Sequence, residues 1–106
     1  MRADVIESLI RYVKHGFSPG SGLRAVLEND LLQAKRGLDS QNWRCLEEIV
    51  ETVQYCLPTS SFGSKEAVNQ WMGLLPEDRE TADVQHSLQM LQTRLQYIRD
   101  LDAAVN

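Results

Sequence analysis

The chain has 106 residues, of which 42% are hydrophobic and 25% are charged, and its formal net charge is −4. This size supports one domain with a single hydrophobic core, and the composition is typical of a soluble globular protein. No apolar run approaches the ~20 residues that cross a bilayer, and the first residues lack the apolar stretch of a signal peptide, so we expect a cytoplasmic protein without a membrane partner. No long basic segment is present, which argues against binding to duplex nucleic acid.

Apolar residues spaced three and four positions apart predict helices throughout the chain. Positions 5, 6, 9, 10 and 13 mark one face of a helix over 4–15, which Gly16 is expected to end. Ser21 is expected to cap a second helix that continues to about Gly37, with Leu23, Val26, Leu27 and Leu31 on one face.

A third helix is predicted from Asp39 or Ser40 to the residues before Pro58, and a short fourth helix follows its expected cap, Ser64. No stretch alternates with period two, as a half-buried strand would. We therefore predict an all-α fold, a small bundle of about four helices over residues 1–75, followed by a long C-terminal amphipathic helix in the segment 76–106.

The C-terminal helix carries a seven-residue hydrophobic repeat, which is typical of a coiled-coil or bundle helix. Such a stripe must be buried, either on the first four helices or on a second copy of the chain. The second possibility predicts a homo-oligomer whose interface is formed by Val84, Leu88, Leu91, Leu95 and Ile98.

Two turns rich in serine and glycine, each leading into a helix, form the candidate ligand-binding site. Helix N-termini present free N–H groups to anions, and the turns add hydroxyl groups and cations. If the two turns meet, they create an electropositive cup of phosphate size. Ordinary helix capping by itself explains the same residue types, and it is the favoured interpretation of either turn taken singly. The candidate residues are His15, Ser18, Gly20, Ser21, Gly22 and Arg24 in the first turn, and Ser60, Ser61, Phe62, Ser64 and Lys65 in the second.

Catalysis, metal binding and cofactors are not expected. His15 and His86 lie far apart in the sequence, without a cluster of acids or thiols beside them. No pairing of a nucleophile with a base is recognisable. Cys45 and Cys56 would lie ~16 Å apart along one helix, too far for a disulfide, so we expect two free thiols.

Several short segments between Tyr12 and Trp71 resemble, in order, a family of short helical proteins common in bacteriophage and prophage genomes. Phe62 stands where that family usually has Trp, and Lys65 where Pro is common. The resemblance implies a phage or mobile-element setting, in which small proteins interfere with host defence or regulation, and it brings no established chemistry. The segments are Tyr12-Val13-Lys14-His15-Gly16, Pro19-Gly20, Ala25-Val26-Leu27-Glu28-Asn29-Asp30-Leu31, Glu48-Ile49-Val50 and Pro58-Thr59-Ser60-Ser61-Phe62-Gly63-Ser64.

Together these features predict a non-catalytic, anti-defence accessory protein. The first hypothesis is that it sequesters a small phosphorylated signalling molecule, such as a nucleotide, in the cup between the two turns. The alternative is an inhibitor that binds and blocks a host defence or regulatory protein, through the tail helix or the surface around Phe62 and Trp71. A weaker alternative is a structural or regulatory subunit of an assembly.

Overall fold

The computed structural model describes residues 1–105, and these form α-helices and two short 3-10 helices without any strand. The all-α prediction is therefore confirmed. Asn106, the last residue of the predicted tail segment, lies outside the described residues. The elements are α1 (Ala3–His15), α2 (Ser21–Leu27), α3 (Leu31–Gly37), α4 (Ser40–Arg44), α5 (Leu46–Cys56), η1 (Thr59–Ser61), α6 (Lys65–Met72), η2 (Pro76–Arg79) and α7 (Ala82–Val105).

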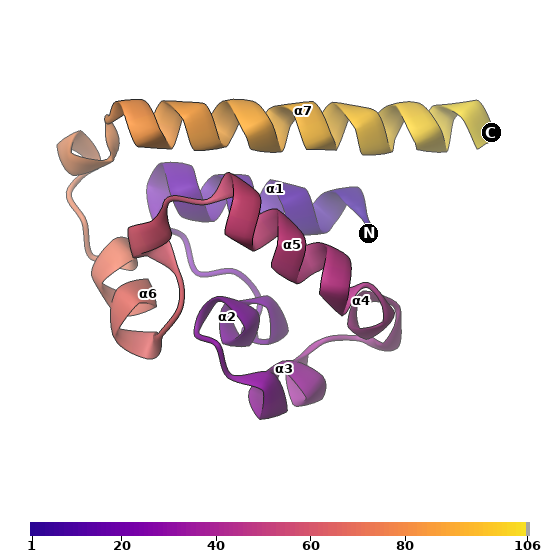
Figure 1. Ribbon diagram of the computed structural model, residues 1–106, viewed down its shortest axis with the longest axis horizontal. Helices are drawn as coiled ribbons and strands as arrows, with labels where there is room; N and C mark the ends of the chain where they lie inside the picture. Colours follow the sequence, from indigo (N-terminus) through magenta and orange to yellow (C-terminus); the bar gives the residue numbers. More distant parts are fainter. Residues whose placement is uncertain (106) are drawn as a thin grey trace.

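The helices are arranged around α1, as Figure 1 shows. The long helix α7 lies along α1 and runs in the opposite direction, and it also contacts α5. Helices α2 and α3 pack against each other on the side away from α7, and α6 closes one end beside α2. Across the described part of the chain, none of these helices is long and apolar enough to span a membrane.

Local sequence signals set the ends of α1 and α6. Gly16 adopts the left-handed conformation, with φ of 71°, and its N–H donates to the carbonyl of Tyr12, which ends α1 at the predicted residue. The side chain of Ser64 accepts a hydrogen bond from the N–H of Ala67, 3.1 Å away, and so caps α6 as predicted.

The predicted second helix is in fact two helices. Asn29 has φ of 61°, a left-handed backbone that a continuing helix does not allow. Asp30 then accepts a hydrogen bond from the N–H of Gln33 and caps α3 as a new helix. The predicted cap Ser21 is the first helical residue, after an N-cap at Gly20 that gives no side-chain hydrogen bond. Because the chain turns at Asn29, Leu31 leaves the face it was expected to share and is exposed.

The predicted third helix is also divided. Asp39 caps α4 by accepting from the N–H of Asn42 at 2.7 Å, as expected. The backbone of Cys45, with ψ of 15°, interrupts the helical path before α5 begins. Cys45 and Cys56 are both free thiols, and burial raises the pKa of Cys56.

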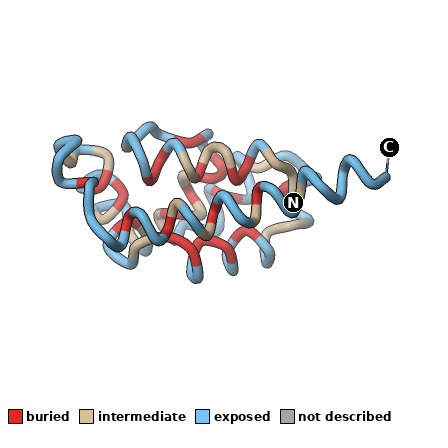
Figure 2. Tube along the Cα trace, turned by 90° about the horizontal axis from the view of Figure 1, so that it is seen from above, coloured by how far each residue is buried: buried red, intermediate tan, exposed pale blue. Residues whose placement is uncertain are grey.

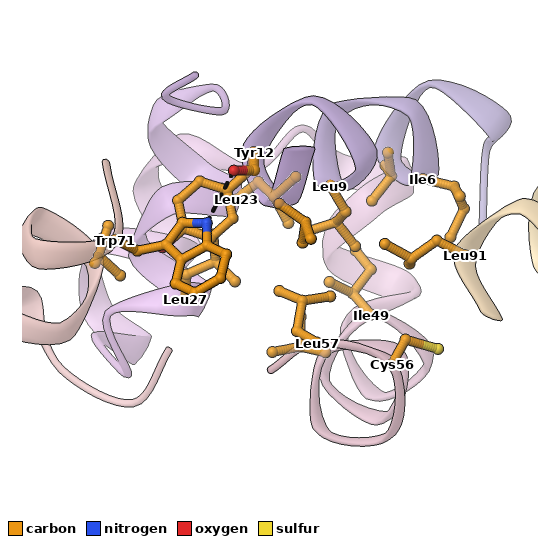
Figure 3. Packing of buried hydrophobic residues seen from close by; sticks show 14 of the residues in the cluster. Ile6, Leu9, Tyr12, Leu23, Leu27, Ile49, Cys56, Leu57, Trp71 and Leu91 are labelled. Carbon is orange, nitrogen blue, oxygen red and sulfur yellow. Dashed lines mark hydrogen bonds between the residues drawn. The ribbon is translucent and has the colours of Figure 1, made fainter. Parts of the chain in front are cut away.

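The core lies between α1, α5 and α7 and extends under α2 and α6 (Figure 3). Tyr12 links α1 to η1 and α6. Its hydroxyl donates to the carbonyl of Ser61 at 2.6 Å, and its own carbonyl accepts from the indole N–H of Trp71 at 3.0 Å. The completely buried large apolar side chains contribute roughly 1.5–3 kcal/mol each to folding. They include Ile6, Leu9, Leu27, Ile49 and Leu91.

The heptad stripe of α7 belongs to this core, which is the first of the two possibilities that the sequence left open. Val84, Leu91 and Leu95 are buried, and Leu88 and Ile98 are half-buried against the same cluster. These side chains contact α1 and α5 of their own chain, so the homo-oligomer stays a prediction that the burial of the stripe does not support. Figure 2 shows that the last turns of α7 extend past the rest of the chain and are exposed.

Candidate binding site

The first serine and glycine turn lines a cavity of about 320 Å³ between α1, the start of α2 and the junction of α3 with α4. Gly20, Ser21 and Gly22 form one wall. The opposite walls carry two carboxylates, Asp4 and Asp39, and both form ion pairs with Arg2, so an anion in this cavity would compete with them for that cation.

Arg24, the expected cation of the cup, is held by three partners within the chain. Its guanidinium donates to Glu28 at 3.2 Å, to Asn69 at 2.9 Å and to the hydroxyl of Ser18 at 3.3 Å. His15, the other basic residue of this turn, is exposed and stacks on Phe17, with ring centroids 5.1 Å apart.

The second turn is mostly occupied by structural hydrogen bonds. Ser61 is completely buried, and its hydroxyl donates to the carbonyl of Pro58 at 2.6 Å. Ser64 caps α6, and Phe62 is half-buried against the core. Ser60 and Lys65 are exposed.

The two turns lie at opposite ends of α2, so within one chain they do not meet in a single cup. Gly20 is the N-cap of α2, whereas the N–H of Gly63 donates to the carbonyl of Leu27, at the other end of that helix, at 2.8 Å. The guanidinium of Arg24 forms a hydrogen bond with α6, the helix after the second turn, but it does so at Asn69 in the middle of that helix.

A different surface has the form of a binding site. Three hollows share Val50 as a lining residue. Two of them lie between α5, the α2–α3 junction and the second turn, and the third lies on the outer face of α5 alone; we call this whole surface the α5 groove. Their volumes are about 270 Å³ beside Phe62, about 70 Å³ beneath Leu31 and about 580 Å³ toward Tyr55. The apolar residues of the groove are Val26, Leu31, Ala34, Leu46, Val50, Val53, Tyr55 and Phe62.

The polar residues of the α5 groove are acidic or neutral. Glu47 and Glu51 line its outer side on α5, and Asp30 lines the side formed by the start of α3. Asn29 and Gln54 are the neutral polar residues between them. Among the described residues that line the groove, none is a lysine or arginine.

The sequence alone did not reveal this groove, because Val50 stands in the middle of a helical apolar stripe. Ile49 and Val53 of that stripe are buried, while Val50 is 37% exposed. The available signal is that Ile49 and Val50 are adjacent, and adjacent residues point about 100° apart on a helix. A helix with both positions apolar has a wider stripe than one packing face needs.

Arg79 is a second residue whose position sequence reasoning missed. It is 5% exposed, lies 5.6 Å above the ring of Trp71, and donates to the carbonyls of Met72 and Leu74. Burial lowers the pKa of its guanidinium, which still stays protonated at neutral pH. No neighbouring carboxylate in the described part of the chain forms an ion pair with it, and its role is to hold η2 against α1 and α6.

Comparison with known proteins does not supply a function: no protein family model, curated protein or solved structure matches the chain. Across residues 1–105 no group of three or more His, Cys, Asp or Glu side chains could hold a metal ion. The resemblance to short phage proteins therefore stays a prediction, and the case for function depends on the geometry described above.

Proposed function

We propose that this protein is a non-catalytic binding protein that acts on another protein by taking an apolar segment of it into the α5 groove. The observation that carries the proposal is the continuity of three hollows around the exposed side chain of Val50. Exposed apolar surface that is contiguous and rimmed by polar residues is typical of protein interaction sites. In the bacterial setting that the resemblance implies, the partner is a host defence or regulatory protein.

The helices that form the walls of the groove are held in place by the core, which supports binding without a large rearrangement. Ile49 and Val53 of α5 are buried in the core, and so is Leu27 of α2. The hydrogen bond from Gly63 to Leu27 fixes the second turn against the end of α2. A preformed site loses less conformational entropy on binding than a flexible one.

Sequestration of a phosphorylated small molecule is less well supported by the geometry. Arg24 would have to release Glu28 and Asn69 to reach a phosphate, and Ser61 is buried and already bonded. The cost of breaking such charge-assisted hydrogen bonds would be subtracted from the affinity for the ligand.

A photo-reactive amino acid placed at Val50 and, separately, at Tyr97 tests the proposal. Both side chains are exposed, and Tyr97 lies on α7, outside the groove. We expect a host protein to cross-link to position 50 and not to position 97, and to be lost from the Val50→Asn variant while Tyr97→Asn retains it. The proposal is wrong if Val50→Asn keeps the partner, or if a nucleotide stabilises the protein and Arg24→Ala removes that effect.

A further inference from the structure

We infer that the segment that occupies the α5 groove is an amphipathic helix whose apolar face is flanked by lysine or arginine. This inference rests on the proposed function and specifies the chemistry of the partner. It is carried by three properties of the groove: its helical walls, the spacing of its apolar residues and the sign of its charges.

The walls favour a helix over an extended peptide. Within residues 1–105 the chain has no strand, so the groove offers no sheet edge to which a peptide strand could add. The groove follows α5, whose backbone groups are bonded within the helix. An extended peptide would bring unpaired N–H and C=O groups to these walls, whereas a helix pairs its own.

Two apolar residues of α5 are spaced as part of one row of a helix-packing surface. Leu46 and Val50 are four positions apart, and Val53, which is buried in the core, lines the groove beside Val50. Rows of this kind pack between the rows of a second helix. Leu31 lines the groove beside Leu46 and Val50, and Phe62 lines it beside Val50 further along α5, so these two side chains provide walls against which apolar anchors of the partner fit.

The charges select a cationic partner. Glu47 and Glu51 stand one helical turn apart on one side of the groove, and Asp30 stands on the other. The nearest cations in sequence are Arg44, which is exposed at the end of α4, and Lys35, whose ammonium lies 5.0 Å from the ring centroid of Trp43; neither lines the groove. A partner with cations on both flanks therefore meets acids on both sides of the groove.

Glu51 forms no ion pair with another residue of the described part of the chain. Glu47 lies in the first turn of α5, where a negative charge is favoured by the helix dipole. Glu51 lies one turn further on, where it repels Glu47 and gains little from the dipole. A cation bound over both carboxylates would relieve that repulsion.

The test uses two synthetic amphipathic helices of about 16 residues, a length that still needs a binding surface to become fully helical. They share one leucine face and differ only in flanks of lysine or of glutamate. Binding is followed by fluorescence anisotropy with the whole chain. The variants are the pair Glu47→Gln with Glu51→Gln, and a matched control, Glu77→Gln with Glu80→Gln, which removes two exposed acids outside the groove.

We expect the lysine-flanked helix to bind roughly tenfold more tightly than the glutamate-flanked one at low ionic strength, and this ratio to shrink as salt rises to about 0.5 M. The ratio should fall toward one in the Glu47/Glu51 variant and persist in the control. Equal binding of both helices that Val50→Asn abolishes overturns this inference and leaves the proposed function standing. Binding that Val50→Asn does not weaken overturns both, and failure of the lysine-flanked helix to bind overturns the inference.

Discussion

Gly22 and Gly37 hold α2 and α3 together backbone to backbone: a Cβ built on Gly37 would lie 2.6 Å from both the Cα and the N atom of Gly22. No side chain larger than hydrogen fits at either residue. This contact sets the position of α3, whose first turn carries the Asp30 and Leu31 side of the α5 groove.

The glycine contact predicts that Gly22→Ala destabilises the protein, although alanine is usually the better helix residue. The new methyl group would meet the carbonyl of Gly37, whose C and O atoms lie 2.5 and 2.8 Å from the ideal Cβ position. We expect a loss of about 1–3 kcal/mol in the free energy of unfolding, measured by urea denaturation. Gly20→Ala is the control: nothing lies within 4 Å of its Cβ position, so its effect should stay below about 1 kcal/mol, which is the cost of alanine at this N-cap. Equal effects would contradict the packing described here.

The burial of the α7 stripe predicts unfolding when it is made polar. Leu91 is completely buried and Leu95 nearly so. Leu91→Ala should cost about 2–5 kcal/mol, and Leu91→Asp with Leu95→Asp should abolish the cooperative thermal transition seen by circular dichroism. A folded, monomeric double variant would instead mean that the stripe is an interface between copies.

Burial of Tyr12 predicts a loss of stability at high pH. Burial raises the pKa of its hydroxyl in the folded protein above the ordinary value of 10.0. The unfolded chain therefore releases this proton first, so the contribution of Tyr12 is complete below about pH 10 and is lost as the pH rises further.

Tyr12→Phe removes both this pH dependence and the hydrogen bond to the carbonyl of Ser61. We expect it to lower the free energy of unfolding by about 0.5–1.5 kcal/mol at neutral pH and to flatten the decline above pH 10. Denaturant titrations across that range measure both effects. If the free energy of unfolding of Tyr12→Phe still falls as steeply above pH 10, another group is responsible for the loss of stability.

The lowered pKa of Asp39 predicts a loss of stability at low pH that is smaller than the loss from Tyr12 at high pH. The N–H of Asn42, and then Arg2, hold the pKa of Asp39 below its ordinary value of 3.8. Its contribution is therefore present above that pH and is lost as the pH falls through the lowered folded-state value. Asp39→Asn should make the acid decline of the melting temperature shallower, whereas Asp102→Asn, in the exposed end of α7, should leave the decline as it is.

The sequence predicted those parts of the fold that depend on local chemistry. Gly16 ends α1, Asp39 and Ser64 cap their helices, and the stripe of α7 is amphipathic, because each of these features is decided by neighbouring residues. The divisions at Asn29 and Cys45 were missed, since the apolar spacing on both sides of each fits one continuous helix. At Asn29 a local signal was present, because asparagine tolerates the left-handed backbone and Asp30 caps the next helix. The contact of Gly22 with Gly37 then holds α2 and α3 together.

The candidate site was harder to predict for the same reason. Serine and glycine at a turn serve capping and anion binding equally well, and distinguishing the two requires the distance between the turns. The α5 groove depends on which side of α5 remains uncovered. Ile49 and Val50 are both apolar and adjacent in sequence, yet only the first is buried in the core.

The most direct test of the central claim is an NMR titration of ¹⁵N-labelled protein with the lysine-flanked helix. The account predicts that amide shifts concentrate at residues around the α5 groove, such as Val26, Leu46, Val50 and Gly63. Shifts that gather instead at Gly20, Ser21, Leu38 and Asp39, around the first cavity, would contradict it.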